Sequence, residues 1–168
     1  MLTQGYYVDY SIINSTTSEK MRTYYDFLVQ YMELFYDKDL TDVSMTHIGW
    51  DNTEYLCQNE NWTVDGEAGK VWLTVREKDN RKLISLINLC ENTDNLWNLG
   101  KNRPEEKYDI KLQVQINHEV KGIYFISPDY YHGQVQELEY TTIKTDRGFV
   151  IQFSVPKLEF WSNVWIDF

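Results

Sequence analysis

Four aromatic residues are the best candidates for binding chemistry, because they lie in polar, loop-like stretches of the chain: Trp62, Trp97, Tyr130 and Tyr131. Sugars present apolar C–H faces that stack on Trp and Tyr rings, while polar neighbours bind the hydroxyl groups. These residues are therefore the predicted carbohydrate-binding residues. For each of them we rank a structural role slightly higher, since large rings commonly hold long loops in place.

Catalytic and metal-binding patterns are missing from the sequence. His47, His118 and His132 are far apart, and none has the spacing of a zinc-ligand pair. The chain has no GxSxG, P-loop or GxGxxG motif, so acyl transfer, phosphoryl transfer and dinucleotide binding lack their usual scaffolds. We therefore predict no catalytic residue, no metal site and no cofactor.

Acidic residues leave a weaker, enzymatic alternative open. Asp65-Gly66-Glu67 could bind Ca²⁺ or act in acid–base chemistry, but Asp-Gly more often marks a turn, here before a strand that begins near Lys70. A stand-alone enzyme would have to use Asp51, Glu54, Asp65 or Glu67, and it ranks last because no catalytic scaffold accompanies these residues.

Charge and composition exclude several classes of function. The net charge is −10 and no more than two basic residues are adjacent, which argues against binding to nucleic acid or to an anionic membrane. No stretch approaches the ~20 apolar residues of a membrane-spanning helix, and residues 1–10 do not resemble a signal peptide. Cys57 and Cys90 form no CxxC pair; we expect two half-buried thiols, although a disulfide stays open.

The elements that must position the aromatic residues follow from the period of the apolar residues. From Thr16 to about Asp37 these residues recur at spacings of three and four, which predicts a helix with an unusually aromatic face. Such a face cannot be buried by a lone helix, so it must pack on another surface.

From about Val43 the period changes to two, which predicts strands. Residues 110–116 and 149–155 alternate between apolar and polar side chains, with Phe149, Ile151, Phe153 and Val155 expected to be buried and Pro156 to end the strand. Several short strands with hairpin turns favour an antiparallel β-sandwich over a parallel α/β sheet. The predicted fold class is therefore mainly β: a sandwich preceded by one N-terminal α-helix.

Several segments also carry a resemblance to a known family. They are Tyr24–Leu28, Tyr31–Asp37, Asp42–Ser44, Gly49–Thr53, Asp65–Trp72, Leu86–Leu89, Asp94-x-x-Trp97, Lys101–Pro104, Ser127–Asp129 and Val155–Trp161. In this order they resemble the C-terminal part of glycoside hydrolase family 66, the family of dextranases and cycloisomaltooligosaccharide glucanotransferases. The resemblance implies that residues 1–42 correspond to the end of a (β/α)₈ catalytic barrel and residues 43–168 to a Greek-key β-sandwich.

The resemblance also implies a role and its partners. The family's two catalytic carboxylates would precede Met1, so this chain is expected to be a non-catalytic fragment that braces the catalytic barrel of its own parent, an enzyme acting on α-1,6-glucan. The alternative is a carbohydrate-binding module for glucan or isomalto-oligosaccharide. In isolation the fragment is expected to expose an apolar face and therefore to form a homodimer or to be poorly soluble, and the resemblance implies an extracellular or periplasmic parent.

Overall fold

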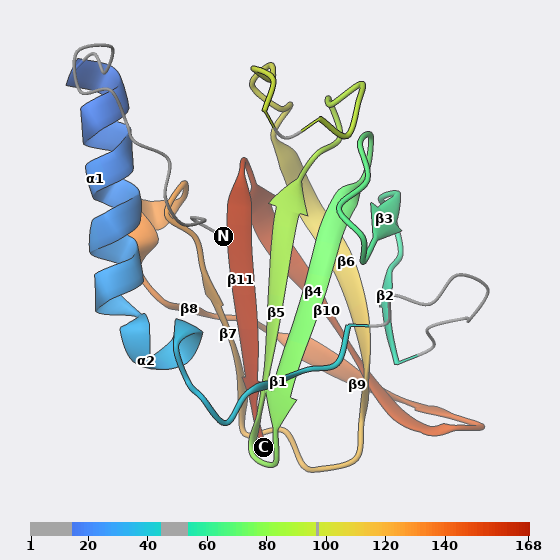
Figure 1. Cartoon of the computed structure of the whole chain (residues 1–168). Coiled ribbons are helices and arrows are strands. Elements are labelled where there is room, and N and C mark those ends of the chain that lie inside the picture. The colour runs from blue at the N-terminus through green and yellow to red at the C-terminus, as the bar shows by residue number, and fades with distance from the viewer. Residues whose placement is uncertain (1–14, 45–53, 97) are drawn as a thin grey trace. The chain divides into compact units, whose positions relative to one another are not determined.

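The computed structural model of the chain describes residues 15–44, 54–96 and 98–168 (Figure 1). The chain divides into two compact units, Met1–Asp37 and Lys38–Phe168. The sequence interpretation divided the chain after residue 42, whereas Thr41–Asp42 forms strand β1, which pairs with β4 of the second unit. Among the described helices, none is both long and apolar enough to cross a membrane.

The described part of the first unit is helical, as the apolar period predicts. Helix α1 (Ser15–Gln30) is followed by the short helix α2 (Met32–Phe35), and the chain departs from helical geometry at Tyr31 between them. The ring of Phe27, which is buried, lies 5.0 Å from that of Tyr31 and 5.8 Å from that of Phe35. The predicted apolar face is only partly covered, because Tyr25 and Met32 remain exposed.

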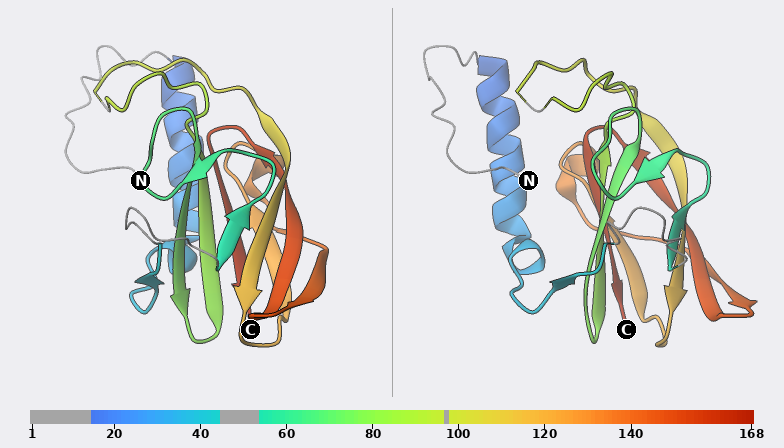
Figure 2. Two further views of the ribbon diagram at one scale, coloured as in Figure 1. Left: turned by 90° about the vertical axis from the view of Figure 1, so that its right-hand side faces the viewer. Right: turned by 45° about the vertical axis from the view of Figure 1, so that its right-hand side comes forward.

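The second unit is a two-layer β-sandwich, and this confirms the predicted fold class. Its remaining elements are β2 (Tyr55–Cys57), β3 (Trp62–Thr63), β4 (Val71–Lys78), β5 (Arg81–Asn88), β6 (Lys107–Ile116), β7 (Gly122–Ile126), the 3₁₀ helix η1 (Tyr131–Gly133), β8 (Gln136–Glu137), β9 (Tyr140–Thr145), β10 (Gly148–Leu158) and β11 (Trp161–Asp167). Figure 2 shows the two sheets as facing layers.

The order of strands shows how the chain moves between the layers. One sheet has the order β1-β4-β5-β11-β7-β8, with β3 paired in parallel to β4, and the other has the order β2-β6-β10-β9. All other pairs are antiparallel. Strand β11 lies between β5 and β7, which are not its neighbours in sequence, so the connections cross between the sheets as in Greek-key sandwiches.

The core lies between the sheets and consists of the alternating apolar residues. In β4 the inward positions are Val71, Leu73 and Val75, and each of these side chains is fully buried. The equivalent positions of β6 and β10 face them from the other layer and include Ile110, Val114, Ile151 and Val155. Burial of side chains of this size contributes about 1.5–3 kcal/mol each, so this layer stabilises the unit without a disulfide or metal.

Strand β10 differs from its prediction at both ends. Phe149 is exposed rather than buried, because the β9–β10 hairpin projects beyond the facing sheet (Figure 1). Pro156 does not end the strand, which continues to Leu158. The register pairs Val155 with Ile110 and Lys157 with Tyr108, so Pro156 falls opposite Asp109, where no pair forms. A proline is tolerated at such a position because no partner needs its missing N–H group.

Candidate functional site

The candidate site includes two of the predicted aromatic residues, Tyr130 and Tyr131, which lie in the loop between β7 and β8. Tyr131 and His132 both have left-handed backbone conformations, with φ of 50° and 55°. The loop is held by Asp129, whose carboxylate oxygen Oδ2 accepts hydrogen bonds from the backbone N–H groups of Phe160 and Trp161 at 3.3 and 3.1 Å. These hydrogen bonds hold the loop that carries the tyrosines against the corner between β10 and β11.

Three tyrosine rings and one lysine form a continuous surface here, which we call the tyrosine platform: Tyr108, Tyr130, Tyr131 and Lys157. The Nζ atom of Lys157 lies 5.9 Å from the ring centroid of Tyr108 and 6.0 Å from that of Tyr130. The rings of Tyr130 and Tyr131 have centroids 6.3 Å apart. Tyr108 and Tyr131 are each 56% exposed, so two of the three rings are open to a ligand.

Carboxylates and cations hold the base of the platform. Lys157 Nζ lies 3.0 Å from Glu106 Oε1 and 3.5 Å from Glu159 Oε2. Arg103 Nη2 lies 2.6 Å from Glu159 Oε1, and Glu159 is buried. A buried carboxylate is costly unless it is paired, so these contacts keep the segment before β6 attached to the end of β10.

The charges of the platform do not suit acid catalysis. The hydrogen bond from the Tyr108 hydroxyl, followed by the contact with Lys157, holds the pKa of Glu106 below its usual value. The same hydrogen bond raises the pKa of Tyr108. A general acid at neutral pH needs a carboxyl pKa that is raised, not lowered. The platform can stack on a ligand and hydrogen-bond to it, but the lowered pKa of Glu106 does not suit a proton donor.

Backbone strain is concentrated at the platform. Among the described residues, the non-glycine positions with positive φ are Asp109, Tyr131 and His132. Asp109 directly follows Tyr108, and Tyr131 is itself a platform residue. Residues in sparsely populated conformations cost of order 1–3 kcal/mol each and cluster at binding sites, where surrounding contacts hold them.

The other two predicted aromatic residues are not part of this surface. Trp62 lies in β3 rather than in a loop, and its partly buried ring packs against the core with its centroid 5.8 Å from that of Tyr55. Trp97 lies outside the described residues. The structure thus brings together Tyr130 and Tyr131, and it adds Tyr108, which the sequence analysis missed.

Of the residues of the enzymatic alternative, the structure describes Glu54, Asp65 and Glu67, and Glu54 is exposed just before β2. Glu67 lies in the β3–β4 loop and forms an ion pair with Lys70, while Asp65 is exposed in the same loop. Asp51 and His47 lie outside the described residues. In the segments that the structure describes, no three His, Cys, Asp or Glu side chains form a group that could hold a metal ion.

The second unit is thus a β-sandwich that carries exposed tyrosines. The family model of glycosyl hydrolase family 66 matches residues 1–165, so the chain belongs to this family. This confirms the resemblance seen in the sequence.

Individual relatives agree with this assignment. A cycloisomaltooligosaccharide glucanotransferase from Niallia circulans is 31% identical over 170 residues, and a second protein of the same name and organism is 26% identical over 176 residues. The crystal structure of a Paenibacillus cycloisomaltooligosaccharide glucanotransferase complexed with cycloisomaltoheptaose superposes on 90% of this chain, with a TM-score of 0.80 and 27% identity. This chain spans 17% of the length of both Niallia proteins and 21% of the Paenibacillus chain.

Proposed function

We propose that this chain is a non-catalytic accessory sandwich of a dextranase-like enzyme acting on α-1,6-glucan, and that it braces the catalytic barrel of the same parent protein. The chain corresponds to a small part of much longer relatives, so the remainder of such a protein is available to contact it. On this proposal, the first unit is the end of the barrel and the second unit is the domain that follows it, with the boundary after Asp37 rather than after residue 42.

The observation that carries the proposal is an exposed apolar stripe on the helical unit: Tyr25, Val29, Met32 and Tyr36. These residues are between 51% and 72% exposed. Tyr25 and Val29, four residues apart, lie on one side of α1, while Met32 begins α2 and Tyr36 directly follows it. An apolar stripe of this length normally faces a partner surface rather than water.

The stripe gives the bracing role a direct test on the isolated 168-residue chain. We expect the chain to self-associate through the stripe, since its natural partner is missing, and to release no product from dextran. Val29→Lys should weaken self-association in sedimentation experiments without unfolding the helix, because Val29 is exposed. Gln30→Lys is the matched control, since it adds the same charge at an exposed neighbouring position outside the stripe. A chain that stays monomeric at high concentration, or that hydrolyses dextran, would contradict the proposal.

A second candidate function is carbohydrate binding, and the tyrosine platform favours it. Its two exposed rings, the adjacent charged groups and the strained backbone are the features expected of a sugar-binding surface. Isothermal titration with isomalto-oligosaccharides tests it. Saturable binding that Tyr108→Ala and Tyr131→Ala abolish would support it, and an unchanged titration in both variants would remove it.

A further inference from the structure

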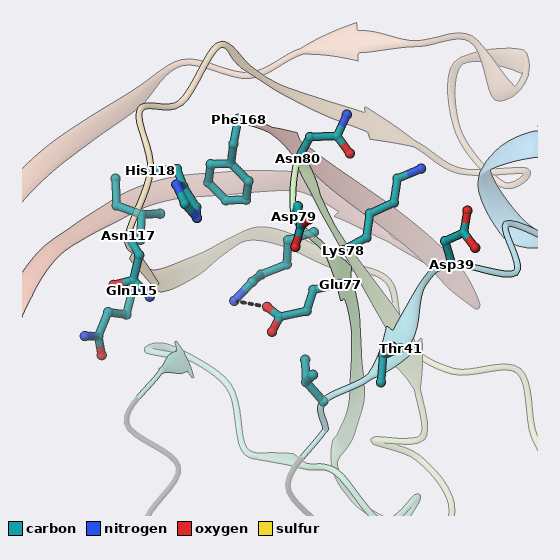
Figure 3. Close-up of a pocket in the computed structure, with 13 residues that line it drawn as sticks. Asp39, Thr41, Glu77, Lys78, Asp79, Asn80, Gln115, Asn117, His118 and Phe168 are labelled. Carbon is teal, nitrogen blue, oxygen red and sulfur yellow. Dashed lines mark ion pairs between the residues drawn. The ribbon is translucent and has the colours of Figure 1, made fainter.

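A pocket of ≈ 800 Å³ lies beside the β4–β5 turn, at the opposite end of β6 from Tyr108 (Figure 3). Three chain segments surround it: the residues around β1, the β4–β5 hairpin and the end of β6, together with Phe168. All of these belong to the second unit. The volume lies within the 300–1,000 Å³ range that is usual for small-molecule sites.

The pocket arises because the inward-facing positions change character at the last level of the sandwich. In β4 every second residue faces inward, and Val75 is followed in this series by Glu77. In the antiparallel strand β5, Lys82 is paired with Glu77 and precedes the apolar Ile84 in the inward series. In β11 the series ends with Phe168, one residue beyond the strand. In β11 the residue paired with Lys82 is the buried Ile166, so the Glu77–Lys82 ion pair interrupts an otherwise apolar level, and Phe168 lies one inward position further along.

Lys82 is unusually buried for a lysine and only partly satisfied. Its side chain is 8% exposed, and its Nζ atom lies 3.0 Å from Glu77 Oε2. Among the described residues, Glu77 is the carboxylate that pairs with it. A lysine ammonium has three N–H donors, so two of them remain for a molecule in the pocket. Figure 3 shows Glu77 directed into the pocket, where the dashed line marks this ion pair.

The pocket walls supply both hydrogen-bonding groups and rings. The amides and carboxylates come from Asp39, Asp79, Asn80, Gln115 and Asn117. The rings of His118 and Phe168 lie side by side with centroids 5.9 Å apart. The wall thus offers an aromatic surface beside a set of donors and acceptors.

This combination selects a class of ligand. Three carboxylates, those of Asp39, Glu77 and Asp79, outnumber the two lysine ammonium groups, so an anion is disfavoured. An apolar ligand would leave the buried Lys82–Glu77 pair without solvation. A neutral polyhydroxyl ligand suits both, because each hydroxyl can accept from Lys82 and donate to a carboxylate, while a sugar ring can stack on the aromatic wall.

We infer that this pocket binds a neutral oligosaccharide, with Lys82 and Glu77 contacting hydroxyl groups and the His118–Phe168 rings contacting the sugar face. The site is distinct from the tyrosine platform and does not depend on the bracing role. A domain with both functions would hold glucan while it supports its neighbour.

Titration of the 168-residue chain with isomaltotriose, followed by calorimetry and by the NMR signals of the His118 ring, tests the inference. We expect saturable binding that shifts the His118 signals. Lys82→Met keeps the aliphatic stem but removes the donors, and it should raise the dissociation constant by about tenfold, the effect of one hydrogen bond to a charged group. Phe168→Ala should have a comparable effect.

Two further variants serve as a control for the loss of a lysine and as a substitute for Lys82→Met. Lys111→Met removes an exposed lysine outside the pocket and should leave binding unchanged. Should Lys82→Met fail to fold, Glu77→Gln replaces the more accessible partner, whose side chain is 41% exposed, and should weaken binding in the same way. Absence of saturable binding, binding unaffected by the pocket variants, or binding lost only in Tyr131→Ala would overturn the inference; the last result would assign the sugar to the platform instead.

Discussion

Asp109 in β6 and Pro156 in β10 face each other at a position where neither residue pairs with the opposite strand. Asp109 has φ of 53°, and its carbonyl oxygen accepts a hydrogen bond from Asn59 Nδ2 at 3.1 Å. The missing pair and the left-handed residue together interrupt the regular ladder just after Tyr108. This local interruption accompanies the exposure of Tyr108, the platform residue that alternation alone did not reveal.

The strain at Asp109 can be measured by substitution. Asp109→Val should lower the free energy of unfolding by about 1–3 kcal/mol, because a β-branched residue is a conformational outlier at positive φ. Asp109→Gly should change it by less than about 0.5 kcal/mol, since relief of strain is offset by a more flexible unfolded chain. Urea unfolding gives both values. Lys111→Val, at an exposed position of the same strand, is the control, and an equal loss there would show that left-handed geometry is not the cause.

Replacing Trp62 and Tyr131 by alanine should have different effects on the free energy of unfolding, because Trp62 packs on the core and Tyr131 lies on the surface. Trp62 packs on Tyr55 and the core, so Trp62→Ala should lower the free energy of unfolding by about 2–3 kcal/mol. Tyr131 is exposed, and Tyr131→Ala should change it by less than about 0.5 kcal/mol. Both values come from the same denaturation series. Similar losses of unfolding free energy in the two variants would mean that the Tyr131 side chain stabilises its loop.

The ion pairs beneath the platform should differ in their contribution according to burial. The Lys157 side chain is 14% exposed and that of Arg103 is 66% exposed. Lys157→Met should therefore cost about 1–3 kcal/mol of unfolding free energy, because it leaves Glu106 without its nearest cation and Glu159 with one partner fewer. Arg103→Met should cost less, because the Arg103 side chain is mostly exposed and Glu159 keeps its contact with Lys157. Thermal or urea unfolding of the two variants checks the order, which a larger effect at Arg103 would reverse.

The buried thiol of Cys57 gives stability a dependence on alkaline pH. Burial raises its pKa from 9.0 to about 11. Between these values the unfolded chain has lost the thiol proton while the folded chain retains it, so the folded state binds more protons and the free energy of unfolding falls as pH rises. Cys57→Ala should show a smaller decline over this range when both proteins are unfolded in urea at each pH. Parallel declines would assign the effect to other groups.

Sequence patterns predicted the parts of this molecule that depend on neighbours along the chain. The alternation in residues 110–116 depends on the local period, and the strand is present. The platform combines Tyr108, Tyr130 and Lys157 from three segments that meet only through the register of β10 and the corner after it. No spacing in the sequence encodes such a meeting.

The pocket was missed for a different reason. Charged residues such as Glu77 and Lys82 are usually exposed, so their types do not indicate an inward direction. Their inward direction follows from the exact length of β4 and β5, since a shift of one residue would turn both outward. Strand boundaries are less certain from sequence than strand identity, so the burial of Lys82 could not be predicted.

The central place of β11 affects how the sandwich can be made. Strands β5 and β7 are synthesised well before β11, yet each depends on it for a neighbour. Until residues 161–167 arrive, β5 and β7 present unpaired backbone edges that can capture strands from other chains. Shortening the chain before Trp161 should therefore cause aggregation rather than yield a smaller stable domain, because the final strand joins the two halves of its sheet.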